Sequence, residues 1–143
     1  MKVDFEEIIF NDKFDVTNKA FYISGNEETL IKKIEKTLVG RFSKNEKRSV
    51  ERIKSIEETT ADQNLFFEKS LIILSEIKGL TKDNIEKLTK EKDLIIVCEN
   101  TRGDQAVKKL FEKSKKLALI NCYKLNTDQK IKFLNFFINK KNI

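Results

Sequence analysis

The chain has 143 residues, which is enough for one domain with a buried core and leaves no room for a second full domain. Apolar residues make up 39% and charged residues 36%, a balance that excludes an intrinsically disordered chain. The net charge of +6 permits binding to an anionic partner, but the lysines are spread along the chain beside acidic residues, so charge alone is weak evidence for nucleic-acid binding.

The amino-terminal segment carries acidic residues where a signal peptide would be apolar. Asp4, Glu6 and Glu7 lie within the first seven residues, and no uninterrupted apolar run in the chain exceeds five residues. Both features argue against an export signal and against a membrane-spanning helix. We therefore expect a cytoplasmic protein that has no membrane partner.

Four short apolar runs predict buried strands: Ala20–Ser24, Leu71–Leu74, Leu94–Cys98 and Leu117–Cys122. They lack the polar alternation of a half-exposed strand, which is typical of a parallel sheet that is covered on both faces. A fifth and weaker candidate is the segment Lys47–Ile53, in which Val50 and Ile53 are the only apolar residues.

Apolar residues recur at helical spacing between these runs and predict four helices. The first opens after Asn26 and ends near Gly40, and the last opens at Thr127. Apolar residues mark the two helices between them: Ile85 and Leu88, then Val107, Leu110 and Phe111. Because strand and helix alternate, we expect residues 1–143 to form one α/β domain of three layers, doubly wound around a mostly parallel five-stranded sheet.

The last predicted helix has apolar residues around more of its circumference than one core contact requires: Phe133, Phe136, Phe137 and Ile138. We expect part of this surface to be covered by the remainder of a longer chain, with a homodimer contact as the alternative.

The turn after the first predicted strand lies where a nucleoside triphosphatase has its phosphate-binding loop. Such a loop needs a second glycine, a lysine for the terminal phosphates and a hydroxyl for magnesium. This chain has Gly25 alone, followed by Asn26, Glu27 and Glu28. The two carboxylates suit the positive end of a helix dipole, but they occupy the place of a phosphate and would repel it. We expect an NTPase-like scaffold whose degenerate loop binds no nucleotide.

Two further elements of an ATPase site are altered. The residues after Leu71–Leu74 are Ser75 and Glu76, where an ATPase has an acidic pair that holds magnesium and polarises water. Ser75 thus stands in place of the metal-binding aspartate. Asn100 follows Leu94–Cys98 where a polar sensor of the γ-phosphate is common, and without a phosphate it is more simply a turn residue.

The chain contains no histidine, which excludes Ser–His and Cys–His catalytic pairs and histidine metal sites. Cys98 and Cys122 lie at the ends of predicted strands without Cys-x-x-Cys spacing, so we expect two reduced core thiols. No catalytic residue, metal or cofactor is therefore expected.

Three large apolar residues, Leu65, Phe66 and Phe67, stand in a row between a polar run and a charged pair. Such a triplet cannot point in one direction, so at least one member is expected to be exposed. The structural interpretation places all three beneath the sheet. The functional interpretation is a hydrophobic plug that enters a pocket of a partner.

From Lys19 to Lys140, the order and spacing of these motifs resemble the amino-terminal domain of the delta subunit of the bacterial DNA polymerase III clamp loader. The matching features are the Ala-Phe-Tyr-Ile-Ser-Gly-Asn-Glu-Glu-Thr-Leu-Ile run, a Leu-Phe pair before the strand Leu71–Leu74, and the later Leu-Ile-Ile-Val strand. Phe67 and Asn64 depart from the family pattern around that pair.

The resemblance implies an AAA+-like domain that does not hydrolyse ATP and that grips the β sliding clamp through Leu65 and Phe66, with Phe67 as a third candidate. In that family the domain helps to open the ring for loading on DNA during replication. Other clamp-loader subunits would be contacted mainly through a helical and a collar domain that this chain lacks, and DNA only indirectly. The resemblance therefore implies an amino-terminal fragment of a longer chain within the polymerase assembly.

Two other classes remain open. A basic α/β module that binds nucleic acid without catalysis would show clustered lysines and salt-dependent affinity. An enzyme of a doubly wound family would use the crevice beyond the carboxyl ends of the strands, with lysine or carboxylates alone as its catalytic groups.

Overall fold

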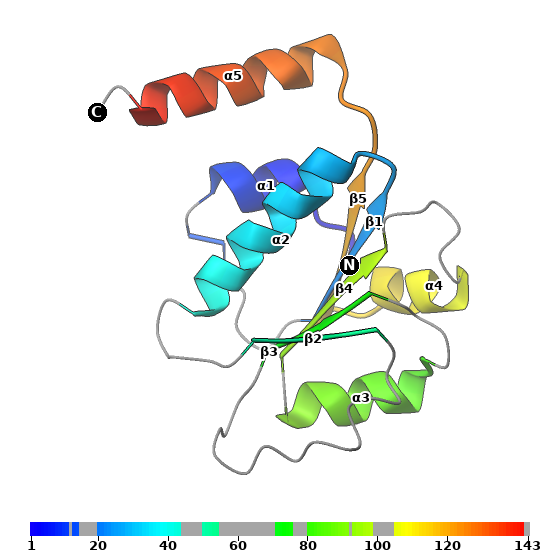
Figure 1. Cartoon of the computed structure of the whole chain (residues 1–143). Coiled ribbons are helices and arrows are strands. Elements are labelled where there is room, and N and C mark those ends of the chain that lie inside the picture. Colours follow the sequence, from blue (N-terminus) through cyan, green and yellow to red (C-terminus); the bar gives the residue numbers. More distant parts are fainter. Residues whose placement is uncertain are drawn as a thin grey trace.

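The computed structural model describes residues 1–11, 13–14, 20–43, 50–54, 71–75, 80–91, 93–98 and 105–141. The strands of these residues form one five-stranded sheet: β1 (Ala20–Gly25), β2 (Val50–Ile53), β3 (Leu71–Leu74), β4 (Asp93–Cys98) and β5 (Leu117–Cys122). Every pairing is parallel, in the order β2-β3-β4-β1-β5. The predicted α/β class is confirmed, and the sheet is wholly parallel instead of mostly so (Figure 1).

The helices cover both faces of the sheet: α1 (Phe5–Phe10), α2 (Glu28–Phe42), α3 (Lys82–Glu91), α4 (Gln105–Lys113) and α5 (Thr127–Lys141). Helices α1 and α2 pack on one face, while α3 and α4 pack on the other. The four helices predicted from apolar spacing are α2 to α5. None of the described helices is both long and apolar enough to cross a membrane.

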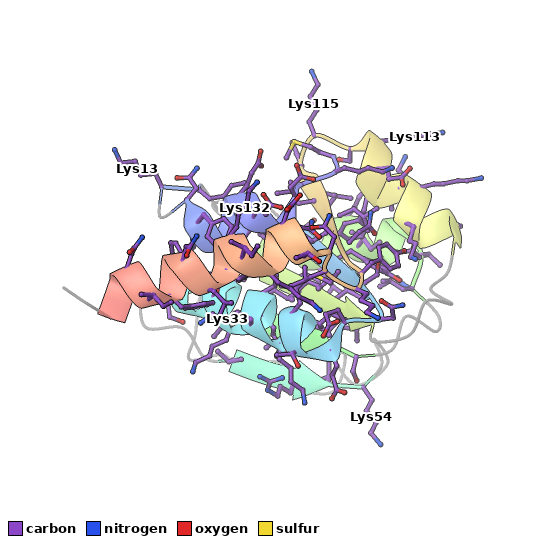
Figure 2. The ribbon with its side chains drawn as sticks, turned by 90° about the horizontal axis from the view of Figure 1, so that it is seen from above. Lys13, Lys33, Lys54, Lys113, Lys115 and Lys132 are labelled. Atoms are coloured by element: carbon purple, nitrogen blue, oxygen red, sulfur yellow. The ribbon has the colours of Figure 1, made fainter. Side chains whose placement is uncertain are left out.

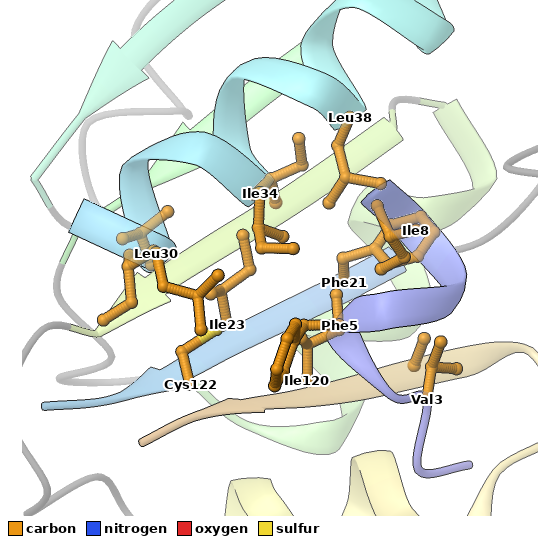
Figure 3. Packing of buried hydrophobic residues seen from close by; sticks show 14 of the residues in the cluster. Val3, Phe5, Ile8, Phe21, Ile23, Leu30, Ile34, Leu38, Ile120 and Cys122 are labelled. Atoms are coloured by element: carbon orange, nitrogen blue, oxygen red, sulfur yellow. The ribbon is translucent and has the colours of Figure 1, made fainter. Parts of the chain in front are cut away.

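Strand β1 explains why the predicted strands are apolar without alternation. Phe21 and Ile23 face the layer that contains α1 and α2, and Tyr22 faces α3 and α4. All three are fully buried, because both faces of a central parallel strand are covered. Figure 3 shows Phe21 and Ile23 beneath Leu30, Ile34 and Leu38 of α2. Burying a side chain of this size contributes about 1.5–3 kcal/mol.

Strand β2 occupies one edge of the sheet and differs from the other strands in its burial. Val50 is 40% exposed and Ile53 is only partly buried, whereas all four residues of β3 are buried. An edge strand has one neighbour and less cover, which accounts for the weak apolar signal of this segment.

The first residues of the chain cover the opposite edge, which the sequence pattern did not predict. The amide of Val3 donates to the carbonyl of Leu119 at 2.9 Å, and the amide of Leu119 donates to the carbonyl of Met1 at 2.9 Å. Lys2 and Leu119 thereby form a parallel bridge at the edge of β5. The short helix α1 follows and buries Phe5, Ile8 and Ile9.

Helix α5 lies outside α1 and α2 and forms a further layer on that side of the molecule (Figure 1). Aromatic rings hold it there: the ring of Phe133 lies 5.7 Å from that of Phe5 and 5.2 Å from that of Phe10, and Phe136 lies 4.8 Å from Phe10. The Nζ atom of Lys33 on α2 lies 4.8 Å from the ring centre of Phe137. The helix therefore packs mainly on other helices and reaches the core through its phenylalanines.

Candidate functional site

The carboxyl ends of β3, β4 and β1 lie side by side at one edge of the sheet. The chain leaves β1 through α2 on one face and leaves β4 through α4 on the other, so the connections diverge between these neighbouring strands. In open α/β sheets this divergence marks the crevice where ligands bind. The turn that contains Gly25 connects β1 to α2 at this point (Figure 1).

Gly25 brings the backbone of this turn close to the end of β5. Its φ of +142° lies in a region that residues with a side chain rarely adopt. A Cβ atom at this position would lie 1.9 Å from the carbonyl oxygen of Cys122. The glycine is therefore required by both backbone conformation and space.

The same carbonyl oxygen accepts hydrogen bonds from two backbone amides of the turn. The N–H groups of Asn26 and Glu27 both donate to the Cys122 carbonyl, each at 3.1 Å. In a phosphate-binding loop such amides point at the anion instead. Here their donor capacity is already used within the fold.

Acidic side chains follow at the amino terminus of α2. Glu27 is the residue before the helix and makes no side-chain cap, and Glu28 is the first helical residue. The Glu28 carboxylate pairs with Lys32 at 2.9 Å, with both side chains largely exposed. The carboxylates of Glu27 and Glu28 place negative charge at the end of the helix where a phosphate would be held in an NTPase.

A buried polar pair beside the turn was missed from the sequence. The hydroxyl of Ser24 donates to Oδ1 of Asn121 on β5 at 3.3 Å, and Ser24 is fully buried. The two residues are paired across β1 and β5 in the parallel register. The hydrogen bond therefore joins β1 and β5 at this end of the sheet.

Ser75 follows β3, as predicted, and is exposed. Its amide donates to the carbonyl of Ile53 at 3.2 Å, and its hydroxyl lies 3.5 Å from the same oxygen. Ser75 therefore extends the pairing between β2 and β3. Glu76 and Asn100 lie outside the described residues. Within the described ranges no three acidic or cysteine side chains come together as a possible metal site.

The predicted plug residues Leu65, Phe66 and Phe67 lie outside the described residues. They belong to the connection that leaves the edge strand β2 after Lys54 and enters β3 at Leu71. Their exposure stays a prediction.

Cys122 is a free, buried thiol at the end of β5, as predicted for a core cysteine. Burial raises the pKa of its thiol to about 12, so the group is protonated at neutral pH. Figure 3 shows Cys122 pointing into the core near Ile23 and Leu30. The side chain of Cys98 lies outside the described part of the structure.

The described lysines point away from the molecule in many directions, as their spread along the sequence predicts. Figure 2 shows Lys13 and Lys54 at opposite sides of the view, with Lys33 and Lys132 between them. Lys113 and Lys115 lie near each other in the chain, at the last residue of α4 and in the turn after it, although their side chains point in different directions. This local concentration was not recognised in the sequence.

Helix α5 presents a second apolar surface on its outer side. Ile131, Leu134 and Ile138 are 50%, 61% and 53% exposed, and their spacing of three and four residues places them in one stripe. The phenylalanines face the opposite way, toward α1 and α2. The excess of apolar residues around this helix, predicted from the sequence, is thus divided between a packed side and an open side.

Comparison of the chain with protein-family models, curated proteins and solved structures finds no match. The class of the chain thus follows from its fold alone: the described residues form an α/β protein with a five-stranded parallel sheet.

Proposed function

We propose that the chain is an AAA+-like domain that does not bind nucleotide and that acts as a clamp-binding module of the delta-subunit kind. The observation that carries the first part is the turn after β1, whose Asn26 and Glu27 amides are bonded to the Cys122 carbonyl. The position of this turn, at the divergence between β1 and β4, is where a nucleotide would otherwise be expected. Without nucleotide chemistry, the remaining role is binding.

The clamp-binding part rests on the resemblance to the delta family from Lys19 to Lys140 and on the plug residues Leu65 and Phe66. Fully burying one leucine and one phenylalanine contributes roughly 3–6 kcal/mol before the costs of association. A module that binds the open ring better than the closed ring shifts the population by that difference in affinity. Ring opening therefore requires no catalysis from this domain, and ATP hydrolysis would belong to other subunits.

The test is calorimetric titration of the chain with the β sliding clamp of the same organism. We expect binding by the unaltered protein and at least a hundredfold loss of affinity in the Leu65→Ala/Phe66→Ala variant. That loss is about 2.7 kcal/mol, within the range for central apolar anchors. A Phe67→Ala variant measured beside it tells whether the third residue contributes to the interface.

A matched control is available on α5. The Ile131→Ala/Leu134→Ala variant removes similar apolar area from a surface that is exposed and remote in sequence from the plug. We expect it to bind the clamp with unaltered affinity. Equal losses in both double variants, or no binding by the unaltered chain, would contradict the proposed plug.

A further inference from the structure

The end of α4 and the turn after it concentrate positive charge. Five of the nine residues from Lys108 to Lys116 are lysines, and Glu112 is the one acidic residue among them. This short segment thus carries a charge of +4 in a chain whose total is +6. We call the four exposed lysines of this segment the α4 patch: Lys109, Lys113, Lys115 and Lys116.

The fold directs these side chains to solvent. Val107 and Phe111 are buried against β1 and β5, so the opposite side of α4 faces outward. Lys109 and Lys113 are one helical turn apart on that outer side. Figure 2 shows Lys113 and Lys115 extending outward from the end of α4 and the turn after it, in different directions.

The charge of the patch is not neutralised by its described neighbours. The Glu112 carboxylate lies 3.6 Å from Nζ of Lys2 and is thus already shared with a lysine outside the patch. Among the described residues, the ammonium groups of the four patch lysines make no ion pair with a carboxylate. Four like charges therefore lie within eight residues of the chain, and their mutual repulsion costs electrostatic energy unless an anion is bound there.

Capping of α4 does not account for the patch. Basic side chains often stabilise the carbonyl groups at the end of a helix. Here the amino-terminal ammonium of Met1 has that role, because it donates to the carbonyls of Phe111, Ser114 and Leu117, at 2.8 Å for Ser114 and 2.9 Å for Leu117. The patch lysines are therefore free for an external partner.

We propose that the α4 patch binds the phosphate backbone of double-stranded DNA. Lysine is a point charge that suits phosphates and does not read base edges through a bidentate contact. Among the described residues the exposed aromatic is Tyr123, which follows the carboxyl end of β5, whereas the patch precedes the amino end of that strand. The patch therefore has no described exposed aromatic ring on which unpaired bases could stack. An acidic protein fits less well, because the centre of a protein–protein interface is usually apolar. Leu110 lies among the patch lysines but is half-buried, so little of its apolar surface is available to a partner.

The patch is separate from the candidate nucleotide site and does not depend on clamp binding. It lies at the amino end of β5, whereas the turn with Gly25 lies at the carboxyl end of β1. A failure of either proposal therefore leaves the other intact.

The experiment measures the fluorescence anisotropy of a labelled DNA duplex with the whole chain, over a series of salt concentrations. If four phosphates are contacted, the affinity falls roughly 100-fold between 50 and 200 mM salt. In the Lys109→Gln/Lys113→Gln/Lys115→Gln/Lys116→Gln variant we expect at least a tenfold loss of affinity at the lowest salt. The slope of log affinity against log salt should fall by about 0.9 for each lysine removed.

The control variant makes the same change in net charge elsewhere, by replacing four exposed lysines with glutamine: Lys13, Lys36, Lys124 and Lys130. We expect it to keep most of the affinity and the original salt slope. Equal losses in the two variants would overturn the proposal, since they indicate attraction by net charge alone. Poly-glutamate that displaces the duplex at an equal concentration of charge would also overturn it, in favour of an acidic protein partner. Circular dichroism of both variants verifies their folding.

Discussion

At the scale of single residues, Gly25 fixes the path of the chain at the candidate site. Its positive φ and the 1.9 Å approach of a hypothetical Cβ to the Cys122 carbonyl leave no place for a side chain. We predict that Gly25→Ala lowers the free energy of unfolding by roughly 3 kcal/mol or more, because both the backbone strain and the clash must be relieved. Urea unfolding followed by circular dichroism measures the change.

Gly40 provides the control for this substitution. It lies within α2, and a Cβ atom there would meet nothing within 4 Å. Gly40→Ala should therefore stabilise the protein by about 0.5–1 kcal/mol through helix propensity. If both glycine variants have the stability of the unaltered protein, the close approach at Gly25 is not as described.

Cys122 gives a second prediction at this scale, concerning pH. Its thiol has a pKa near 12 in the folded protein and an ordinary value of 9.0 in the unfolded chain. The folded state keeps its proton while the unfolded state loses it, so stability is full below pH 9 and falls as pH rises from 9 toward 12. Where the folded state binds one proton more than the unfolded state, the free energy of unfolding falls by about 1.4 kcal/mol for each pH unit.

This slope is measured by comparing two proteins that lack Cys98. Between pH 9 and 11, the Cys98→Ser protein should lose stability more steeply than the Cys98→Ser/Cys122→Ala protein, which has no thiol to titrate. The rate of thiol labelling of the Cys98→Ser protein at pH 8 should likewise be limited by the rate at which the protein unfolds. Rapid labelling under native conditions would contradict the buried position of Cys122.

At the scale of secondary-structure elements, hydrogen bonds at the first residues of α5 define where this helix begins. The amide of Asn126 donates to Oε1 of Gln129 at 3.0 Å, and the amide of Gln129 donates to Oδ1 of Asn126 at 2.8 Å. This reciprocal arrangement is a capping box. Asn126 is thus the N-cap, and the helix begins at Thr127, as predicted from the sequence.

We predict that Asn126→Ala destabilises α5 by about 1 kcal/mol, because an amide of the first turn loses its acceptor. Amide hydrogen exchange should become faster in α5 while the amides of β1 and β5 keep their protection. Because the helix contacts α1 and α2 through aromatic rings and is not part of the sheet, we expect it to open separately from the sheet. Equal acceleration in the sheet would show instead that α5 and the sheet unfold as one unit.

The elements found from the sequence and those missed differ in length and in their partners. Helices α2 and α5 have 15 residues each, so their apolar spacing is visible over several turns. Helix α1 has six residues, fewer than two turns, and carries no readable period. It packs on Phe133 from the far end of the chain, a contact that no local pattern contains.

At the scale of the whole molecule, the strand order decides what the candidate site can bind. Because β5 lies beside β1, its terminal carbonyl reaches the turn and takes the amides of Asn26 and Glu27. We predict that Mg-ATP does not raise the thermal midpoint of unfolding, whereas a ligand at 100 times its Kd would stabilise the protein by about 2.7 kcal/mol.

The Glu27→Gln/Glu28→Gln variant separates the two physical reasons for this prediction. It removes the repulsive carboxylates and leaves the amides bonded to Cys122. The variant should also be insensitive to Mg-ATP, because the donors stay occupied. A rise of the midpoint with ATP concentration in the variant alone would identify charge as the barrier, and a rise in both proteins would contradict the degenerate site.

The site itself could be predicted only in part. The lone Gly25 and the acidic residues after it are visible in the sequence and indicate a loop unsuited to phosphate. The carbonyl of Cys122 and the pair of Ser24 with Asn121 depend on which strand lies beside β1, and that neighbour is 97 residues away. The pairing of Glu112 with Lys2 likewise becomes evident only when the first residues reach α4.

The position of β1 also has a consequence for how the chain is made. On the ribosome β1 is synthesised first among the strands, yet its two neighbours in the sheet, β4 and β5, are synthesised last. Until residue 98 has left the exit tunnel, Phe21 and Ile23 lack both flanking strands, and the second neighbour, β5, is complete only when residue 122 has left it. The central strand therefore gains its complete hydrogen-bonded surroundings only when nearly the whole domain has been synthesised, and its apolar residues stay exposed until then.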